Sequence, residues 1–313
     1  MIRVALRRLA QAALTALAAS LLVWAMLPLA PGDPAYRILK SQAPEHEPTP
    51  AEIADLREDM GLDRPFPVRY AAWLGRVVQG DLGVSWRTGQ PVSDEIARRL
   101  PATLTLLGLA LAVSVLVALA LALISAAFRD RWPDRLIRAY TQVGAALPTF
   151  LFGLLALQYV VVGAGVGRVL SGGTLGMAIL PALIIGVDRA AGWTQLLRAS
   201  LIDAMNSGYA QVSRARGARS RRTLLIHALP NAALPFLTAI GVSIGALLGG
   251  SPIIEELFTW PGLGSYTLAA LTARDFPVIQ AFVLVSAGLY VVSSLLIDLA
   301  AIAIDPRLRA ARA

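Results

Sequence analysis

The chain contains no cysteine, a single lysine (Lys40) and only two histidines, and each shortage excludes a class of chemistry. Without cysteine there can be no disulfide, no thiol nucleophile and no metal site built on thiolates. A phosphate-binding P-loop needs a lysine that follows Gly and precedes Ser or Thr, whereas Lys40 follows Leu39. If ATP drives this protein, another chain must therefore bind it.

Residues that support catalysis are equally scarce. His46 and His227 are far apart in the sequence, and no His-Glu-x-x-His motif is present. His46 stands between Glu45 and Glu47, a triplet that could touch a metal, although an exposed histidine next to proline is more often a plain surface residue. We therefore expect no enzyme activity, no cofactor and no metal site.

Hydrophobic residues are abundant instead. They make up 56% of the 313 residues, and the mean hydropathy is +0.63. Six apolar runs are long enough to cross about 30 Å of hydrocarbon: 9–30, 101–127, 137–163, 174–195, 229–250 and 278–304. The first run could instead be a signal peptide, but it is longer than the usual apolar core of one. We predict an all-α polytopic membrane protein with six transmembrane helices.

The arginines set the expected orientation. With both termini in the cytosol, the cytosolic segments hold 16 basic residues against four acidic ones, and the outer segments hold 11 against 14. The positive-inside rule favours this arrangement over its inverse. The segments then divide into an N-terminal span (1–30), a helical outer subdomain (31–100), a five-helix core (101–308) with a cytosolic loop at about 199–228, and a cytosolic tail (309–313). Within the outer subdomain, Thr49 or Pro50 could start a short helix.

The cytosolic loop has the most informative sequence. Five arginines lie within the nine residues 214–222. Residues 209–218 can form a short helix that Gly217 ends, Ser220 could cap the next helix, and Pro230 lies where that helix would enter the bilayer. On these grounds alone, an ordinary basic loop held to anionic lipid headgroups is an equal alternative.

This loop resembles the coupling loop of ABC-importer permeases. That pattern is Glu-Ala-Ala, three residues, Gly, and a Leu-Pro pair further on; Gly217, Leu229 and Pro230 match it, whereas residues 211–213 (Gln-Val-Ser) do not. The departure is typical of the dipeptide, oligopeptide and nickel branch. Tyr209, Ala215, His227 and Asn231 also match the variant of the pattern that is found in that branch. Further tripeptide-scale matches to that branch run from Gly32-Asp33-Pro34 to Asp305-Pro306-Arg307.

The resemblance implies a type I ABC permease fold in the bacterial inner membrane, embedded in lipid. It implies a second homologous permease, two ATP-binding subunits and a substrate-binding protein as partners, and no nucleic acid. The expected ATPase contacts are Tyr209, Arg214, Ala215, Arg216, Gly217 and Pro230.

A second group of candidates follows the fifth apolar run. It is expected to contact the binding protein or to form an outer gate: Gly250, Glu255, Phe258, Trp260, Pro261 and Gly262. The alternative is a re-entrant turn that packs against the outer subdomain, with Trp260 as an interfacial aromatic side chain.

Charges inside the apolar runs are candidates for the transport path. Asp188 and Arg189 lie in the fourth run, and as neighbours on a helix they point about 100° apart. A proton-driven secondary transporter that uses Asp188 and Asp298 is an alternative. It should show inverted repeats, and we find none.

The expected cargo is nickel or a metal chelate, with di- or oligopeptides as the alternative. The connection at 164–173 is short, as in nickel-type members, whereas peptide-type members often carry a longer insert there. A likeness of this kind indicates a cargo without identifying the residues that bind it.

Overall fold

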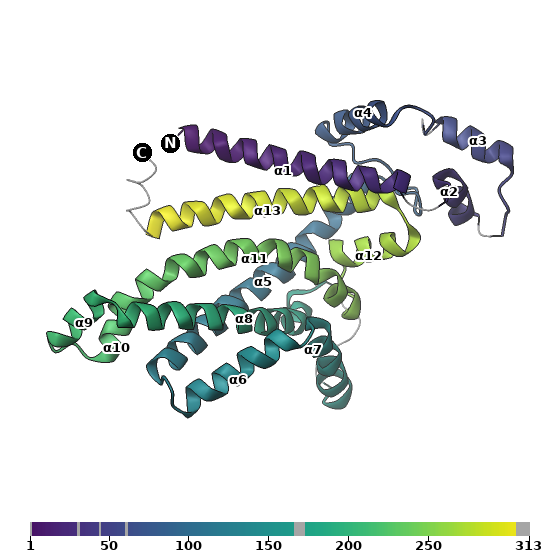
Figure 1. Ribbon diagram of the computed structural model, residues 1–313. Coiled ribbons are helices and arrows are strands. Elements are labelled where there is room, and N and C mark those ends of the chain that lie inside the picture. The colour runs from purple at the N-terminus through teal and green to yellow at the C-terminus, as the bar shows by residue number, and fades with distance from the viewer. Residues whose placement is uncertain (1, 30–31, 44, 60–61, 166–172, 305–313) are drawn as a thin grey trace. The chain divides into compact units, whose positions relative to one another are not determined.

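The computed structural model describes residues 2–29, 32–43, 45–59, 62–165 and 173–304, and within them the chain is helical, without strands (Figure 1). The helices, η marking π-helical turns, are α1 (Ile2–Leu29), α2 (Pro34–Gln42), α3 (Pro50–Asp59), α4 (Phe66–Val78), α5 (Val92–Ala127), α6 (Trp132–Ala146), α7 (Thr149–Ala156), η1 (Leu157–Gly163), α8 (Leu175–Asn206), α9 (Gly208–Ala215), α10 (Ser220–Thr223), η2 (Leu224–Ala228), α11 (Leu229–Leu257), α12 (Leu263–Ala273) and α13 (Phe276–Ile304). The all-α prediction is confirmed.

Four described helical stretches are long and apolar enough to cross a membrane: 92–127, 175–206, 220–257 and 276–297. The pair α6 and α7–η1 would make a fifth, and α1 contains a shorter apolar stretch, Ala13–Ala25. The prediction of a polytopic membrane protein is therefore confirmed. By length and composition, the described residues show four or five of the six predicted spans.

The third predicted span, 137–163, is not one straight helix. It bends by 102° between Ala146 and Thr149. Pro148 lies at the break, and proline disfavours helical geometry at the residue before it. Leu147 accordingly adopts an extended conformation, with φ −104° and ψ 138°. The uniform hydropathy of this run concealed the break.

The fifth predicted span also ends later than expected. Helix α11 continues through Gly249 and Gly250 to Leu257, so residues 251–257 are helical and not a loop. Ile254 and Glu255 are buried on this extension. Packing of these side chains outweighs the weak helix propensity of the two glycines.

The chain divides into two compact units, one of residues 1–101 with 262–291 and one of residues 102–261 with 292–313. The core of the second unit consists of buried side chains from α5, α8 and α11, among them Ala118, Trp193, Leu197 and Phe236. Helices α8 and α11 run side by side, with the short helices α9 and α10 at one end (Figure 1).

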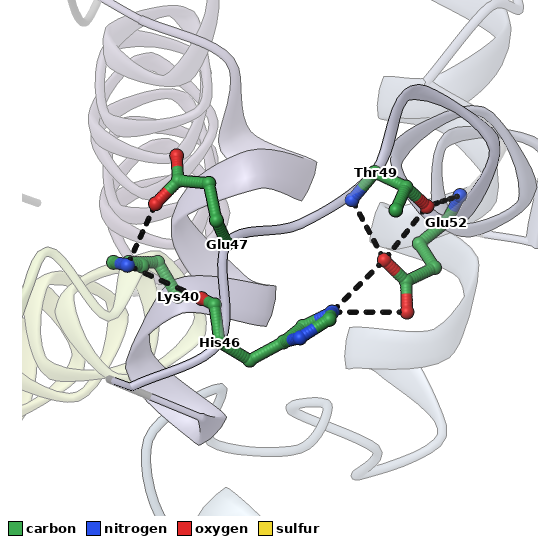
Figure 2. A network of polar contacts seen from close by, with 5 residues as sticks. All are labelled: Lys40, His46, Glu47, Thr49 and Glu52. Carbon is green, nitrogen blue, oxygen red and sulfur yellow. Dashed lines mark hydrogen bonds and ion pairs between the residues drawn. The ribbon is translucent and has the colours of Figure 1, made fainter.

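In the first unit, the segment between α2 and α3 is held by a polar network (Figure 2). Thr49 and Glu52 form a reciprocal capping box: the Glu52 carboxylate accepts from the Thr49 backbone N–H at 2.7 Å, and Thr49 Oγ1 accepts from the Glu52 N–H at 3.3 Å. Lys40 Nζ binds Glu47 at 2.8 Å, and His46 Nε2 lies 3.1 Å from Glu52. This confirms the expected start of α3 at Thr49 or Pro50.

A second anchor in this unit is Asp275, which is buried at the start of α13. Its carboxylate accepts hydrogen bonds from the Ser85 hydroxyl and from the backbone N–H groups of Trp86 and Arg87. The loop before α5 is thus held by a residue that follows it by about 190 positions.

Candidate functional site

The short helix α9 ends in a complete Schellman motif at Gly217. The Ala218 N–H donates to the Ser213 carbonyl at 3.1 Å, and the Gly217 N–H donates to the Arg214 carbonyl at 2.9 Å. Gly217 has φ +84°, a left-handed conformation that favours glycine. The expectation that Gly217 stops this helix is confirmed.

One side of α9 is buried and the other is exposed. Ala210 is fully buried, and the Ser213 hydroxyl lies 3.3 Å from that of Thr223. Tyr209 is 43% exposed and Val212 53% exposed, and three residues apart they share a helix face. Val212 had counted only as a mismatch to the Glu-Ala-Ala pattern, so its place beside Tyr209 was overlooked.

The arginines of this loop have different roles. Arg214 Nη1 donates to the Met205 carbonyl at 3.0 Å, so it satisfies a carbonyl in the last turn of α8. Arg216, Arg219, Arg221 and Arg222 are exposed. Arg214 therefore positions α9 against α8, in addition to any contact it makes with a partner.

The helix that follows the loop differs from the prediction at its first residue. Ser220 is the first residue of α10, and the residue at the cap position is Arg219, without a side-chain cap. The helical stretch continues through Pro230, from Ser220 to Leu257. The π-helical turn η2 ends at Ala228, two residues before Pro230. Asn231 Nδ2 donates to the His227 carbonyl at 2.7 Å. Such turns satisfy backbone groups that a proline disturbs.

An ion pair with a buried carboxylate joins α8 to α6 and, through a serine, to α5. Arg198 on α8 makes two 2.8 Å hydrogen bonds to the Asp134 carboxylate at the start of α6, and Asp134 is fully buried. Ser125, near the end of α5, binds both groups. The sequence analysis missed this cluster. Asp134 in the first turn after Pro133 was a signal for a helix start, but nothing local indicated its partner.

The outer candidates lie in the last turns of α11 and just after it, and four of the six are buried. Glu255 is 0% exposed, Phe258 3% and Trp260 1%. The Thr103 hydroxyl donates to Glu255 at 2.9 Å, and Trp260 Nε1 donates to the Ala102 carbonyl at 3.0 Å. These side chains fasten α11 to α5, so in this conformation they offer little surface to a binding protein.

The other members of that group differ in exposure. Gly250 and Pro261 are exposed, whereas Gly262 is buried. Pro261 lies 3.2 Å from the position that a Cβ on Gly173 would occupy. Gly262 belongs to the first unit and the other five to the second, so the six residues do not form one surface within either unit.

Asp188 and Arg189 lie within α8, as predicted. Thr149, at the start of α7, donates to the Asp188 carboxylate at 2.8 Å. The Nε of Arg189 is buried and has no hydrogen-bond partner among the described residues. The side chain of Asp298, the second carrier in the proton-driven alternative, lies outside the described residues.

Comparison with known proteins decides the family. Residues 118–310 match the binding-protein-dependent transport system inner membrane component, and residues 1–107 match the N-terminal region of such membrane components. The chain belongs to this family. It is a permease subunit of an ABC transporter, not an enzyme, and it works with a substrate-binding protein and ATPase subunits.

Similar proteins cover nearly the whole permease. A putative peptide permease protein of Brucella ovis is 37% identical over 99% of both chains. A glutathione transport system permease protein of Pectobacterium atrosepticum is 36% identical over 94% of this chain and 95% of its own. The protein of that name from Escherichia coli K12 is 34% identical over 93% of both. The expected relation to peptide-type importers is confirmed, and these relatives give nickel no specific support.

One short motif in this permease has the sequence pattern of a hydrolase nucleophile site. Residues 241–245 read Gly-Val-Ser-Ile-Gly, the pattern of a nucleophile elbow. An elbow is a sharp turn between a strand and a helix, whereas these residues lie inside α11. Ser243 Oγ accepts a hydrogen bond from Trp193 Nε1 at 3.1 Å. The serine therefore joins α8 to α11.

Two members of the Glu-His-Glu triplet at 45–47 bind other side chains of the permease. His46 faces Glu52, and Glu47 accepts from Lys40 (Figure 2). Glu47 also accepts from the Tyr36 hydroxyl at 2.9 Å. Among the described residues, no group of three or more His, Cys, Asp or Glu side chains could hold a metal ion. The triplet thus offers no argument for nickel.

Proposed function

We propose that this permease carries short peptides, including glutathione-like tripeptides, into the bacterial cytoplasm. The observation that supports this cargo is the near full-length similarity to peptide and glutathione permeases. Nickel was favoured because the connection at 164–173 is short, but the relatives named above give that cargo no specific support. The peptide reading therefore replaces nickel as the first hypothesis.

The proposed assembly contains a second homologous permease, so that each permease supplies half of the path. Both termini are cytosolic, residues 31–100 form a periplasmic subdomain and residues 101–308 the transport core, which lipid surrounds. The excess of arginine in the segments then assigned to the cytosol supports this orientation.

In this proposal α9 is the contact with an ATPase subunit. Tyr209, Val212 and Arg216 supply an exposed mixed apolar and basic surface, and arginine can bind acidic partners in a bidentate manner. Movement of α9 would reach α8 directly, and from there α5 and α6 through Arg198, Asp134 and Ser125. The gate between inward- and outward-facing states would include Glu255 and Trp260.

The cargo is tested by uptake in a strain that lacks this permease, compared with its parent. Labelled glutathione, a labelled dipeptide and radioactive nickel are supplied separately. We expect loss of peptide or glutathione uptake with nickel uptake unchanged. Loss of nickel uptake alone would refute the peptide assignment. Uptake that persists after deletion of the ATPase subunits would favour the proton-driven alternative.

The coupling role is tested at Gly217, where an added Cβ would meet no described atom of this chain within 4 Å. Alanine costs about 1–2 kcal/mol in a left-handed conformation, whereas asparagine tolerates it. If an ATPase subunit approaches this backbone closely, both Gly217→Ala and Gly217→Asn should reduce peptide-stimulated ATP hydrolysis at unchanged permease levels. Full activity of Gly217→Asn would show that only the turn matters.

A further inference from the structure

A cavity of about 490 Å³ lies among α6, α7 and α8. Its walls are mostly apolar and include Val143, Phe152, Leu183 and Ile184, with Tyr140 and Asp188 as the polar members. This volume falls within the range of pockets that hold small organic molecules, about 300–1,000 Å³. The cavity is therefore large enough for part of a short peptide.

Among the described residues, Asp188 is the one carboxylate in this wall. Its Oδ2 accepts from Thr149, and a carboxylate can accept about four hydrogen bonds in total. The Tyr140 hydroxyl donates to the Val187 carbonyl, so its proton is already engaged. Arg189 is not among the described residues that line the cavity. The carboxylate thus retains acceptor capacity beside an apolar space, where a charge is costly unless it is paired.

We propose that this cavity is a subsite of the transport path in which Asp188 receives the free α-ammonium group of a peptide. The apolar wall contacts the side chain of the first residue, and Thr149 orients the carboxylate. An ammonium group matches the site because it pairs with a carboxylate through charge-assisted hydrogen bonds. This inference rests on the proposed peptide cargo and adds the end of the peptide that is recognised.

The absence of cysteine makes a site-specific test possible. A single Leu183→Cys substitution places a thiol in the cavity wall, at a residue that is 41% exposed. The variant is assembled with its partner subunits in vesicles of phosphatidylethanolamine and phosphatidylglycerol and treated with a water-soluble maleimide. We expect the thiol to react, and an excess of Ala-Ala to slow the reaction about tenfold or more.

The recognised group is tested with N-acetyl-Ala-Ala, which lacks the ammonium. It should protect the introduced thiol at least tenfold less well than Ala-Ala does, a difference of about 1.4 kcal/mol. Asp188→Asn should abolish this discrimination. Asp203→Asn is the matched control, because Asp203 is an exposed aspartate on the same helix and outside the cavity. The comparison of Ala-Ala with N-acetyl-Ala-Ala needs no substitution at Asp188. It therefore tests the proposal even if Asp188→Asn misfolds.

Three outcomes would overturn the proposal. Labelling of the introduced thiol by a membrane-soluble maleimide alone would show that lipid fills the cavity. Equal protection by both peptides would show that the ammonium is not recognised. Peptide uptake without any protection would remove the subsite and leave the peptide cargo intact. Protection without uptake would instead refute the proposed cargo function while supporting the subsite.

Discussion

At the scale of single residues, the ion pair of Asp134 and Arg198 links α6 to α8 within the second unit. Asp134 is fully buried, and its carboxylate also accepts from the Asp130 backbone N–H at 2.9 Å. A buried carboxylate is tolerated only when it is well paired. The polar contacts that join α5, α6 and α8 therefore depend on Arg198.

Replacing Asp134 with asparagine should destabilise the permease by about 3–5 kcal/mol, because the Arg198 guanidinium loses its buried partner. Unfolding in detergent, followed by tryptophan fluorescence, measures the effect. Arg138→Gln is the control: its Nε is 3.8 Å from Asp134 and the side chain is 46% exposed, so it should cost less than about 1 kcal/mol. Equal effects of the two variants would contradict this account.

The capping box at α3 should respond to acid. Hydrogen bonds from the backbone and side chain of Thr49, and a weaker one from His46, lower the pKa of Glu52 to about 2. The folded-state pKa lies below the unfolded one, so the stability that this group contributes is present above about pH 4.5 and is lost as the pH falls toward 2.

A carbon-13 NMR titration of the glutamate carboxyl groups in detergent would test this expectation. One resonance should titrate near pH 2, and it should be missing in Glu52→Gln. Thr49→Ala should move that resonance back toward the ordinary glutamate range. A Glu52 midpoint near 4.5 in the parent permease would contradict the proposed cap.

At the scale of elements, small residues set how closely the helices approach one another. Gly186 on α8 faces Val113 on α5, and a Cβ at Gly186 would lie 2.5 Å from Val113 Cγ1. Close contact through glycine is a general feature of helix packing in membranes. Glycine at this position is a packing requirement and not a sign of flexibility.

Gly186→Ala should therefore separate α5 and α8 and destabilise the permease by about 1–3 kcal/mol through overpacking. Gly192→Ala on the same helix should be neutral or slightly stabilising, because a Cβ there meets no described atom within 4 Å and alanine favours the helix by up to about 1 kcal/mol. Detergent unfolding midpoints of the two variants measure the difference. A tolerated Gly186→Ala would show that these helices can move apart freely.

At the scale of the whole molecule, charge distribution governs the expected orientation. Five arginines within residues 214–222 stand against no acidic residue in that segment. A single cysteine that replaces exposed Arg219 should therefore lie on the cytosolic side. It should react with an impermeant maleimide only after the membrane is permeabilised. A cysteine at exposed Arg64 should react in intact spheroplasts. The reverse pattern would invert the proposed topology.

The sequence by itself determined the features that depend on neighbouring residues. Apolar run length indicated membrane helices, Gly217 marked the end of α9, and Thr49 or Pro50 indicated the start of α3. These signals are local because helix and cap hydrogen bonds join residues three to five positions apart. Resemblance along the chain then indicated an importer permease of the dipeptide, oligopeptide and nickel branch.

Only the tertiary structure decided which distant side chains meet. Asp134 and Arg198 are 64 positions apart, Thr103 and Glu255 are 152 apart, and Thr149 reaches Asp188 across 39. The burial of Trp260 also depends on how helices pack. Hydropathy and charge counts assign each residue a depth or a side of the membrane. They carry no information on which helix faces lie together, and those contacts form the ion pair and the cavity.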